Sequence, residues 1–317
     1  MRLAVAFCLF LGLFSLIEAS AQPRRTLIDA GAAGRVLVVP QAMDGEVLRL
    51  SRRGRTPWQA RAQRFETFRD GAPVPIGENE TALGVTGWTG GAYCCWTLHL
   101  FRQGAQGLAH VASLPFGKRE PEEVRLSPPG GPAILLSDAV FDFWEAPVSL
   151  AADLSPTVPF RWTGRALEPD TAAMRRPVTA ALGTACTDMA APEDQPPPEQ
   201  RFATYPDSAA AITALRAADW AARPGGRARH PGVEAARIAV CLIYAGHADE
   251  ARRLLRAVWP EGAAGLPETE RQIAGRLACS PFRDAVRAVN ATGAPFLGAR
   301  CRRNGPDQTA VFALGWR

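Results

Sequence analysis

Residues 231–260 read PGVEAARIAVCLIYAGHADEARRLLRAVWP, and this stretch decides the fold of the second half of the chain. Apolar residues recur at helical spacing before and after Gly246: Ala236, Ala239, Val240 and Ile243, then Ala251, Leu254, Leu255 and Val258. Residues with that spacing lie on one side of a helix. A glycine between two such patterns is a typical helix end. The stretch therefore predicts two helices joined by a tight turn.

The turn at 246–251, Gly-His-Ala-Asp-Glu-Ala, resembles the loop of a tetratricopeptide repeat. In that repeat a glycine ends the first helix, and an alanine five residues later lets the second helix pack closely. The chain departs from the pattern at Val258, where a small residue is usual, and at Pro260, which comes early. Further helices are expected at 207–222, 267–278 and 281–291. We expect a compact α-helical bundle, and the resemblance implies a short tetratricopeptide-like solenoid as the alternative.

The first half of the chain has a shorter period. Alternating runs occur at 34–40, 46–51, 96–101, 108–114, 133–136 and 159–164. Turn-forming pairs rich in glycine and proline separate these runs, and long amphipathic helical patterns are absent between them. This half is predicted to be an antiparallel β-rich lobe, either a sandwich or a partial propeller.

A proline-rich stretch separates the predicted β-rich half from the predicted helical half. MAAPEDQPPPEQ at 189–200 has the composition of an extended, poorly packed connector. The sequence therefore predicts an α+β protein with a β-rich lobe at 22–177, a connector at 178–204 and an α-helical lobe at 205–317.

The beginning of the chain has the order of a secretory signal peptide. Arg2 precedes an apolar run from Leu3 to Ile17, and small residues follow at 19–21. We expect residues 1–21 to be removed and the mature protein to be periplasmic or secreted. About 15 apolar residues are few for a membrane-spanning helix, and no later run is longer, so no transmembrane segment is expected after cleavage.

Six cysteines follow the expected cleavage site: Cys94, Cys95, Cys186, Cys241, Cys279 and Cys301. Export would place them in a compartment where disulfides persist. We treat all six as candidate disulfide residues, because spacing alone does not give their pairing.

Two of these cysteines, Cys94 and Cys95, are adjacent, just before a predicted strand. Neighbouring side chains on a strand point to opposite faces, so the pair does not serve one ordinary buried role. One interpretation is a vicinal disulfide, whose strained geometry Gly90 and Gly91 would ease. A second is that each cysteine forms a disulfide with the helical lobe. A third is that both are small apolar residues without a bond.

The segment Gly90-Gly91-Ala92-Tyr93-Cys94-Cys95 resembles one in uncharacterised secreted bacterial proteins. In those proteins a Gly-Gly-Ala-His/Tyr-Cys-Cys segment lies in a β-sheet lobe similar to an irregular or partial propeller. The resemblance implies a fold type and no particular activity. An acidic calcium loop often lies upstream in those proteins, whereas this chain has GENET at 77–81, so calcium binding is not expected.

The net charge of the chain is +5, which is weak support for a nucleic-acid partner at this length. Positive charge is concentrated in residues 49–69, which hold Arg49, Arg52, Arg53, Arg55, Arg61, Arg64 and Arg69. Glu66 is the one acidic residue among them. This segment predicts a surface for an anionic envelope polymer or another envelope protein. The alternative is a solvated loop.

Other chemistry has little support in the sequence. The motifs of metalloproteases, serine hydrolases and phosphate-binding loops are absent. The four histidines, His99, His110, His230 and His247, lack metal-ligand spacing, and the last two are expected at the surface. Asp138 and Asp142 are interpreted as surface carboxylates beside aromatic residues.

No catalytic residue, metal or cofactor is therefore predicted. The chain is expected to be an exported cell-envelope protein with a non-enzymatic binding or scaffolding role. The alternative is a periplasmic hydrolase with a motif-free active site, and two of His99, His110, Asp138 and Asp142 brought together in a pocket would favour it.

Overall fold

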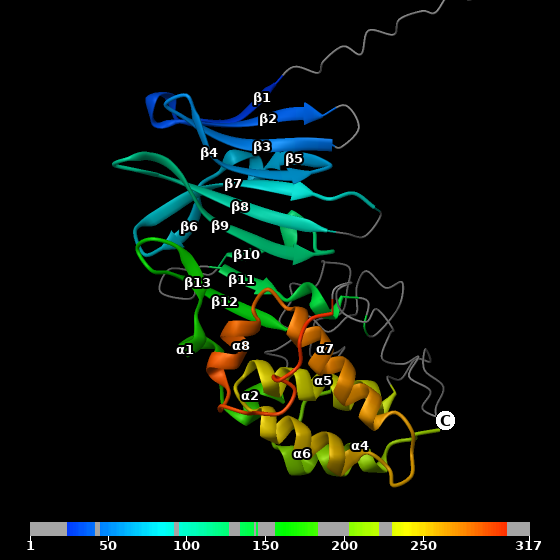
Figure 1. Ribbon diagram of the computed structural model, residues 1–317. Helices are drawn as coiled ribbons and strands as arrows, with labels where there is room; N and C mark the ends of the chain where they lie inside the picture. The colour runs from blue at the N-terminus through cyan, green and yellow to red at the C-terminus, as the bar shows by residue number, and fades with distance from the viewer. Residues whose placement is uncertain are drawn as a thin grey trace, which may run out of the picture.

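The computed structural model describes residues 24–41, 45–91, 95–126, 134–142, 144, 156–182, 203–221 and 230–302. Antiparallel sheets form the first half and helices the second, which confirms the α+β class. The three sheets lie one above another, and the helices pack below the third (Figure 1). The predicted signal peptide and the proline-rich stretch 189–200 lie outside the described residues.

The first two sheets come from consecutive strands. The first has the order β1 (Arg25–Asp29), β2 (Arg35–Gln41), β3 (Gly45–Arg52) and β4 (Arg55–Ala62). The second has the order β5 (Arg64–Thr67), β7 (Glu80–Trp88), β8 (Trp96–Gly104) and β9 (Gly107–Gly117), and β6 (Val74–Gly77) also pairs with β7. Short 3-10 turns η1 (Gly31–Ala33) and η2 (Phe68–Gly71) connect strands within these sheets.

The third sheet leads into the helices. Its order is β10 (Arg125–Leu126), β11 (Ile134–Ser137), β12 (Thr157–Trp162) and β13 (Leu167–Pro169). The 3-10 turn η3 (Pro121–Glu123) precedes it and η4 (Ala139–Phe141) follows β11. The helices are α1 (Thr171–Met174), α2 (Val178–Ala181), α4 (Ser208–Ala217), α5 (Pro231–Tyr244), α6 (Ala248–Val258), α7 (Leu266–Cys279) and α8 (Arg283–Val289).

The predicted helix hairpin is present as α5 and α6. Gly246 between them has a φ of 94°, a left-handed conformation that favours glycine. A side chain at this position would also meet the Val289 carbonyl oxygen of α8 at 2.8 Å. The glycine is therefore needed both for the turn and for the close approach of α8.

Helix α5 is the centre of the helical half, since all 14 of its residues are buried. A helix that is buried on every side must satisfy its polar groups internally. Glu234 and Arg237 do so by forming an ion pair one turn apart, and Arg237 also donates to the Ala203 carbonyl oxygen at 3.1 Å. This pair ties the chain before α4 to the central helix.

The chain contains two hydrophobic cores of unequal size. The larger runs without a break from one face of the second sheet through the third sheet and into the helices. The smaller lies between the first and second sheets and includes Ile28, Val36, Leu48, Phe65 and Phe101. The third sheet and the helices therefore share one interior, while the first sheet packs separately on the outer face of the second.

A buried carboxyl group fixes the contact between the third sheet and the helices. Asp138 follows β11 and its side chain is fully buried. It accepts hydrogen bonds from Tyr244 of α5, from Ser280 after α7 and from the Val140 backbone at 3.1 Å. Burial raises the pKa of Asp138 more than these three hydrogen bonds lower it. The expectation that Asp138 lies at the surface is wrong, because its partners come from distant parts of the chain.

The residues after Asp138 are held in the same way. Trp144 donates to Gln272 of α7 at 2.7 Å, and Arg276 donates to the Val140 carbonyl oxygen. Asp142, also expected at the surface, is 7% exposed and accepts from the Lys118 backbone at 3.0 Å. Asp142 and Trp144 thus link the end of β9 to α7.

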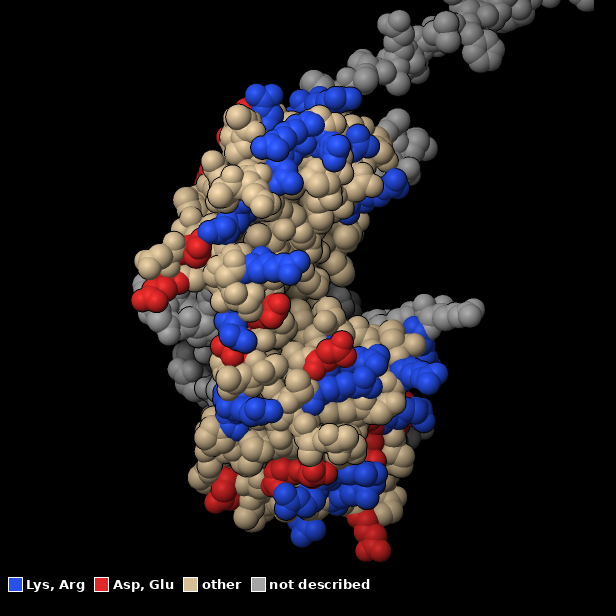
Figure 2. Space-filling model, turned by 60° about the vertical axis from the view of Figure 1, so that its left-hand side comes forward, with Lys and Arg blue, Asp and Glu red and all other residues tan. Residues whose placement is uncertain are grey.

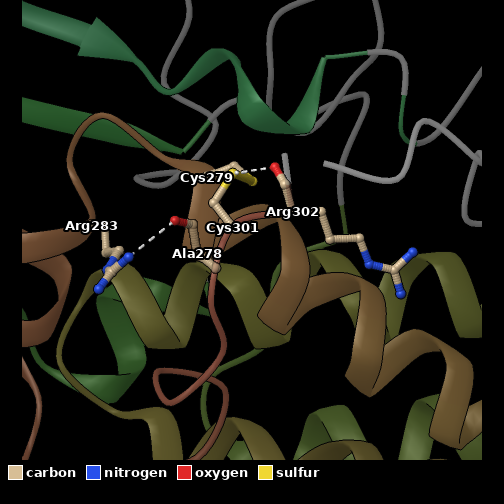
Figure 3. Close-up of a disulfide and its surroundings, with 5 residues drawn as sticks. All are labelled: Ala278, Cys279, Arg283, Cys301 and Arg302. Atoms are coloured by element: carbon tan, nitrogen blue, oxygen red, sulfur yellow. Dashed lines mark hydrogen bonds between the residues drawn. A yellow bond between two sulfur atoms is a disulfide. The ribbon is translucent and has the colours of Figure 1, made fainter. Parts of the chain in front are cut away.

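A disulfide closes the end of the described chain. Cys279, the last residue of α7, is bonded to Cys301 across a separation of 22 residues (Figure 3). Arg283 lies beside the bond and donates to the Ala278 carbonyl oxygen at 3.5 Å. The bridge therefore holds the segment after α8 against the end of α7.

Replacing Asp138 tests the buried carboxyl group. Asp138→Ala leaves three donors without an acceptor, so the free energy of unfolding should fall by at least about 3 kcal/mol.

Asp138→Asn matches a protonated carboxyl group in shape and in hydrogen bonding. Because the pKa of Asp138 is raised by folding from its usual 3.8, its stabilising contribution is present at low pH and is lost as the pH rises through the folded-state pKa.

The wild-type protein should therefore lose stability relative to Asp138→Asn as the pH rises from about 4 through the folded-state pKa of Asp138. Urea unfolding of both proteins across this range measures the difference. Parallel pH curves would contradict the raised pKa.

Removing the terminal disulfide should destabilise the fold. A bridge that closes a loop of about 20 residues stabilises by about 2–4 kcal/mol, mainly by restricting the unfolded chain. The Cys279→Ala/Cys301→Ala double variant should lose that much free energy of unfolding in urea and keep its circular dichroism spectrum. An unchanged unfolding midpoint would show that the bridge contributes nothing.

Candidate functional site

The arginine-rich segment 49–69 forms β3, β4 and β5, so the alternative of a solvated loop is wrong. Alternation along the strands directs Leu48, Leu50 and Trp58 into the smaller core. Arg49 and Arg61 lie on the opposite, outer face of the first sheet. Arg49 pairs across the strands with Gln59, two residues before Arg61, so the two arginines are diagonal neighbours about 7–8 Å apart.

The turn between β3 and β4 adds three more arginines. Arg52 and Arg55 are directly opposite each other, an arrangement in which like charges repel. Between them, Arg53 and Gly54 have φ values of 49° and 73°, as a tight hairpin turn requires. Asparagine, aspartate or glycine is usual where Arg53 stands, so local structure alone does not explain this arginine.

Three of the seven arginines in the predicted binding surface have structural roles. Arg52 donates to the Gln106 carbonyl oxygen at 3.1 Å. Arg64 pairs with Glu66 at 2.9 Å and lies over the Trp88 ring at 5.3 Å, and Arg69 donates to the Val124 carbonyl oxygen at 2.9 Å. Among the described residues, no acidic side chain pairs with the other four: Arg49, Arg53, Arg55 and Arg61.

The excess positive charge of the whole chain belongs to this one sheet. Residues 24–62 hold eight arginines and three acidic residues, a net charge of +5. The whole chain has 36 basic and 31 acidic residues, so the remainder holds 28 of each and is neutral. Figure 2 shows the difference: basic side chains dominate the upper end, where the first sheet lies, and both signs mix below.

Two of the three acidic residues in 24–62 are already paired within the sheet. Arg25 contacts Glu46 at 2.6 Å and Arg35 contacts Asp29 at 3.1 Å. The third, Asp44, lies outside the described residues. The charges within these two ion pairs cancel. The positive charges of the arginines in the β3–β4 hairpin are therefore not neutralised by them.

A second cluster lies on the second sheet, on the face that packs against the first sheet. His99 of β8 is directly opposite Ser113 of β9, and Phe101 is directly opposite His110. The register shifts by one residue between these two pairs, which leaves Val111 as a β-bulge. Without the bulge, His110 and Ser113 would point to opposite faces, because they are three residues apart on one strand.

The bulge brings two imidazole rings to one hydroxyl group. Nδ1 of His99 and Nε2 of His110 each lie 2.9 Å from Ser113 Oγ. The Trp58 ring stacks on the His110 ring at 4.2 Å and meets the His99 ring at 5.1 Å. Burial lowers the pKa of both histidines to about 4, and for His99 the charge of His110 adds to the effect. Both rings are therefore neutral at pH 7, and Ser113 itself is exposed.

The other two histidines are held by structural hydrogen bonds to backbone groups. His230 is 3% exposed, which contradicts its expected surface position, and its ring accepts from the Gly232 backbone at the start of α5. His247 is half-buried and bonds the Arg176 carbonyl oxygen at 2.6 Å. Of the four residues proposed as a possible hydrolase site, only His99 and His110 come together.

The candidate cysteines are mostly bonded. Cys95 and Cys241 each form a disulfide, in addition to the Cys279–Cys301 bond. Cys94 and Cys186 lie outside the described residues, so the vicinal bond stays a prediction. Gly90 and Gly91, just upstream of the cysteine pair, have φ values of 98° and 92°, a left-handed conformation that favours glycine.

The helical half contains a pocket of about 180 Å³ at the turn before α6. His247, Asp249, Glu250 and Asn290 contribute polar atoms to its lining. Asn290 already accepts from the Ala248 backbone at 2.9 Å, and Glu250 pairs with Arg253. These contacts stabilise the turn and give the pocket no distinct chemistry.

Comparison of the chain with protein-family models, with curated proteins and with solved structures finds no match. The described residues include no group of three or more His, Cys, Asp or Glu side chains arranged to hold a metal ion. In the same part of the chain, no helix is both long and apolar enough to cross a membrane.

Trp58 of the first sheet packs on the histidine cluster of the second sheet, and replacing it should loosen the first sheet. Trp58→Ala removes contacts with His99, Phe101 and His110. We expect a loss of about 2 kcal/mol in the free energy of unfolding, less than the 3–5 kcal/mol of a fully buried tryptophan, because the ring is partly exposed. The neighbouring outward residue gives a matched control, Gln59→Ala. Equal losses in the two variants would show that the ring does not hold the sheets together.

Proposed function

We propose that this chain is an exported cell-envelope protein whose first sheet binds a polyanionic ligand without transforming it. The observation that carries the proposal is the confinement of the whole net charge of +5 to residues 24–62. Four arginines of that region have no acidic partner among the described residues. The disulfides support an oxidising compartment.

The arrangement of the arginines favours an extended ligand. Arg49 and Arg61 stand on a sheet face about 7–8 Å apart, and Arg53 and Arg55 continue the charge to the end of the hairpin. Guanidinium groups bind phosphate and carboxylate oxygens in bidentate fashion. A sheet that carries several arginines suits a polymer with repeated negative groups, such as an anionic envelope polymer. An anion between Arg52 and Arg55 would also relieve their mutual repulsion.

A hydrolase is the second candidate, and the contact between Ser113 and His110 favours it. A serine within 2.9 Å of a histidine nitrogen has the spacing of a nucleophile and its base. General-base catalysis is most efficient when the pKa of the base lies near the working pH. The pKa of His110 is about 4, so this ring is a weak base at neutral pH, and binding is the better supported function.

The same proposal extends to the finer architecture. The first and third sheets follow chain order strand by strand, as propeller blades do, which supports a partial propeller over a sandwich. Helix α5 is buried along its whole length, whereas a helix of a solenoid contacts only its neighbours. This supports a bundle in the helical half.

Removing two outer-face charges should weaken binding to a polyanion. We expect Arg49→Gln/Arg61→Gln to raise the Kd for long-chain polyphosphate about tenfold or more, since each basic side chain near an anionic surface contributes about 1 kcal/mol. The salt dependence of the Kd should also become shallower. Fluorescence anisotropy of labelled polyphosphate at several salt concentrations measures both.

The control for this experiment is Arg161→Gln/Arg165→Gln, which removes two exposed charges from the third sheet. This control should bind like the wild type. Equal weakening in both double variants would mean that only the overall charge matters, and it would contradict a site on the first sheet. Vesicles containing phosphatidylglycerol, tested in parallel, separate a polymer from a lipid surface.

A further inference from the structure

The histidine cluster has a geometry that the polyanion site does not use. Two imidazole nitrogens from neighbouring strands approach the same point, the hydroxyl oxygen of Ser113, at 2.9 Å each. The His99 ring comes from β8 and the His110 ring from β9. The two residues lie on either side of a register shift, and only the bulge at Val111 puts both rings on one face of the sheet. Bulges of this kind often redirect a side chain toward a functional site.

We propose that His99 Nδ1, His110 Nε2 and Ser113 Oγ form an open binding site for a divalent transition-metal ion, with copper(II) preferred over zinc(II). This site lies on the face of the second sheet that packs against the first sheet, and it is independent of the arginines on the outer face of the first sheet. Water would complete the coordination, because Ser113 is exposed.

The donor atoms decide the class of metal. Imidazole nitrogen suits copper, nickel and zinc, whereas magnesium and calcium require several carboxylate or carbonyl oxygens. None of the three side chains is a carboxylate. For a given set of nitrogen and oxygen donors, copper(II) binds most tightly among the first-row divalent ions. The neighbouring positive charge opposes any cation, so binding must come from the metal–nitrogen bonds themselves.

The distances require a small movement of one ring. Two metal–nitrogen bonds of about 2.0–2.1 Å bring the nitrogens to within about 4 Å of each other. Both nitrogens are now 2.9 Å from a common oxygen, so they are less than 6 Å apart. His99 is 6% exposed and held by its neighbours, whereas His110 is only half-buried and is the ring that can close the gap.

The surroundings prepare the ligands for this role. A metal binds the neutral form of histidine, and the burial that lowers the pKa of both rings keeps them neutral. Trp58 stacks on His110 and orients the ring. The same arrangement would report binding through the fluorescence of Trp58, because a paramagnetic ion held by His110 would lie beside its indole ring and quench it.

Titration of the untagged protein with copper(II) and with zinc(II) tests the site. Isothermal calorimetry should show one copper ion per chain, with zinc binding more weakly. His110→Gln should weaken copper binding at least tenfold, and His99→Gln should do the same. His247→Gln, a histidine of the helical half, is the matched control and should bind like the wild type.

Electron paramagnetic resonance provides a second measurement in case the buried His99 variant does not fold. The copper spectrum of the wild type should show two coordinated imidazole nitrogens, and that of His110→Gln should show one. The Arg49→Gln/Arg61→Gln variant should keep copper binding, so failure of the polyanion proposal leaves this one standing. Absence of copper binding would overturn the site, as would an affinity that is unchanged in His110→Gln or reduced as much in His247→Gln.

Discussion

The structure depends on the buried carboxyl group of Asp138. Removing a carboxyl group from water is unfavourable unless hydrogen bonds replace the lost hydration. Here the replacements come from α5 through Tyr244, from the end of α7 through Ser280 and from the turn that Asp138 itself begins. These donors meet only when the third sheet and the helices are docked. The two halves of the sequence therefore form one interior, which the continuous hydrophobic core confirms.

The first sheet stands apart from this arrangement, and its separation explains its chemistry. It has its own smaller core against the second sheet. Its other face carries Arg49, which is half-buried, and Arg61, which is exposed. The face of the second sheet that packs against it holds the polar cluster of His99, His110 and Ser113, where Trp58 of the first sheet closes the contact between the two sheets.

Local patterns in the sequence predict the elements well and the site poorly. Alternation places the strand at 96–101 and separates Leu98 from His99, and helical spacing gives both helices around Gly246. The helix predicted at 207–222 ends at Ala217, because Ala218 adopts an extended backbone. Such patterns arise from short-range periodicity, which survives without knowledge of the tertiary fold.

Tertiary partners have no such signature, and this is why the sequence misplaced Asp138 and Asp142 at the surface. The side-chain partners of Asp138, Tyr244 and Ser280, lie more than 100 residues away along the chain. His110 and Ser113 point to the same face only because of a one-residue bulge. Their separation of three residues in the sequence does not predict this bulge. The sequence shows that arginines gather in residues 49–69. It does not show which of them share one face of the sheet, because that depends on the register of β3 and β4.

Hydrogen exchange in increasing urea, followed by mass spectrometry, tests the single shared interior most directly. If Asp138 and the continuous core join the third sheet to the helices, the amides of α5 and of β11 and β12 should exchange with the same free energy and the same dependence on urea. The first sheet should open at a lower free energy. Protection of α5 under conditions in which β11 and β12 already exchange fully would contradict a common interior and would show two independent units.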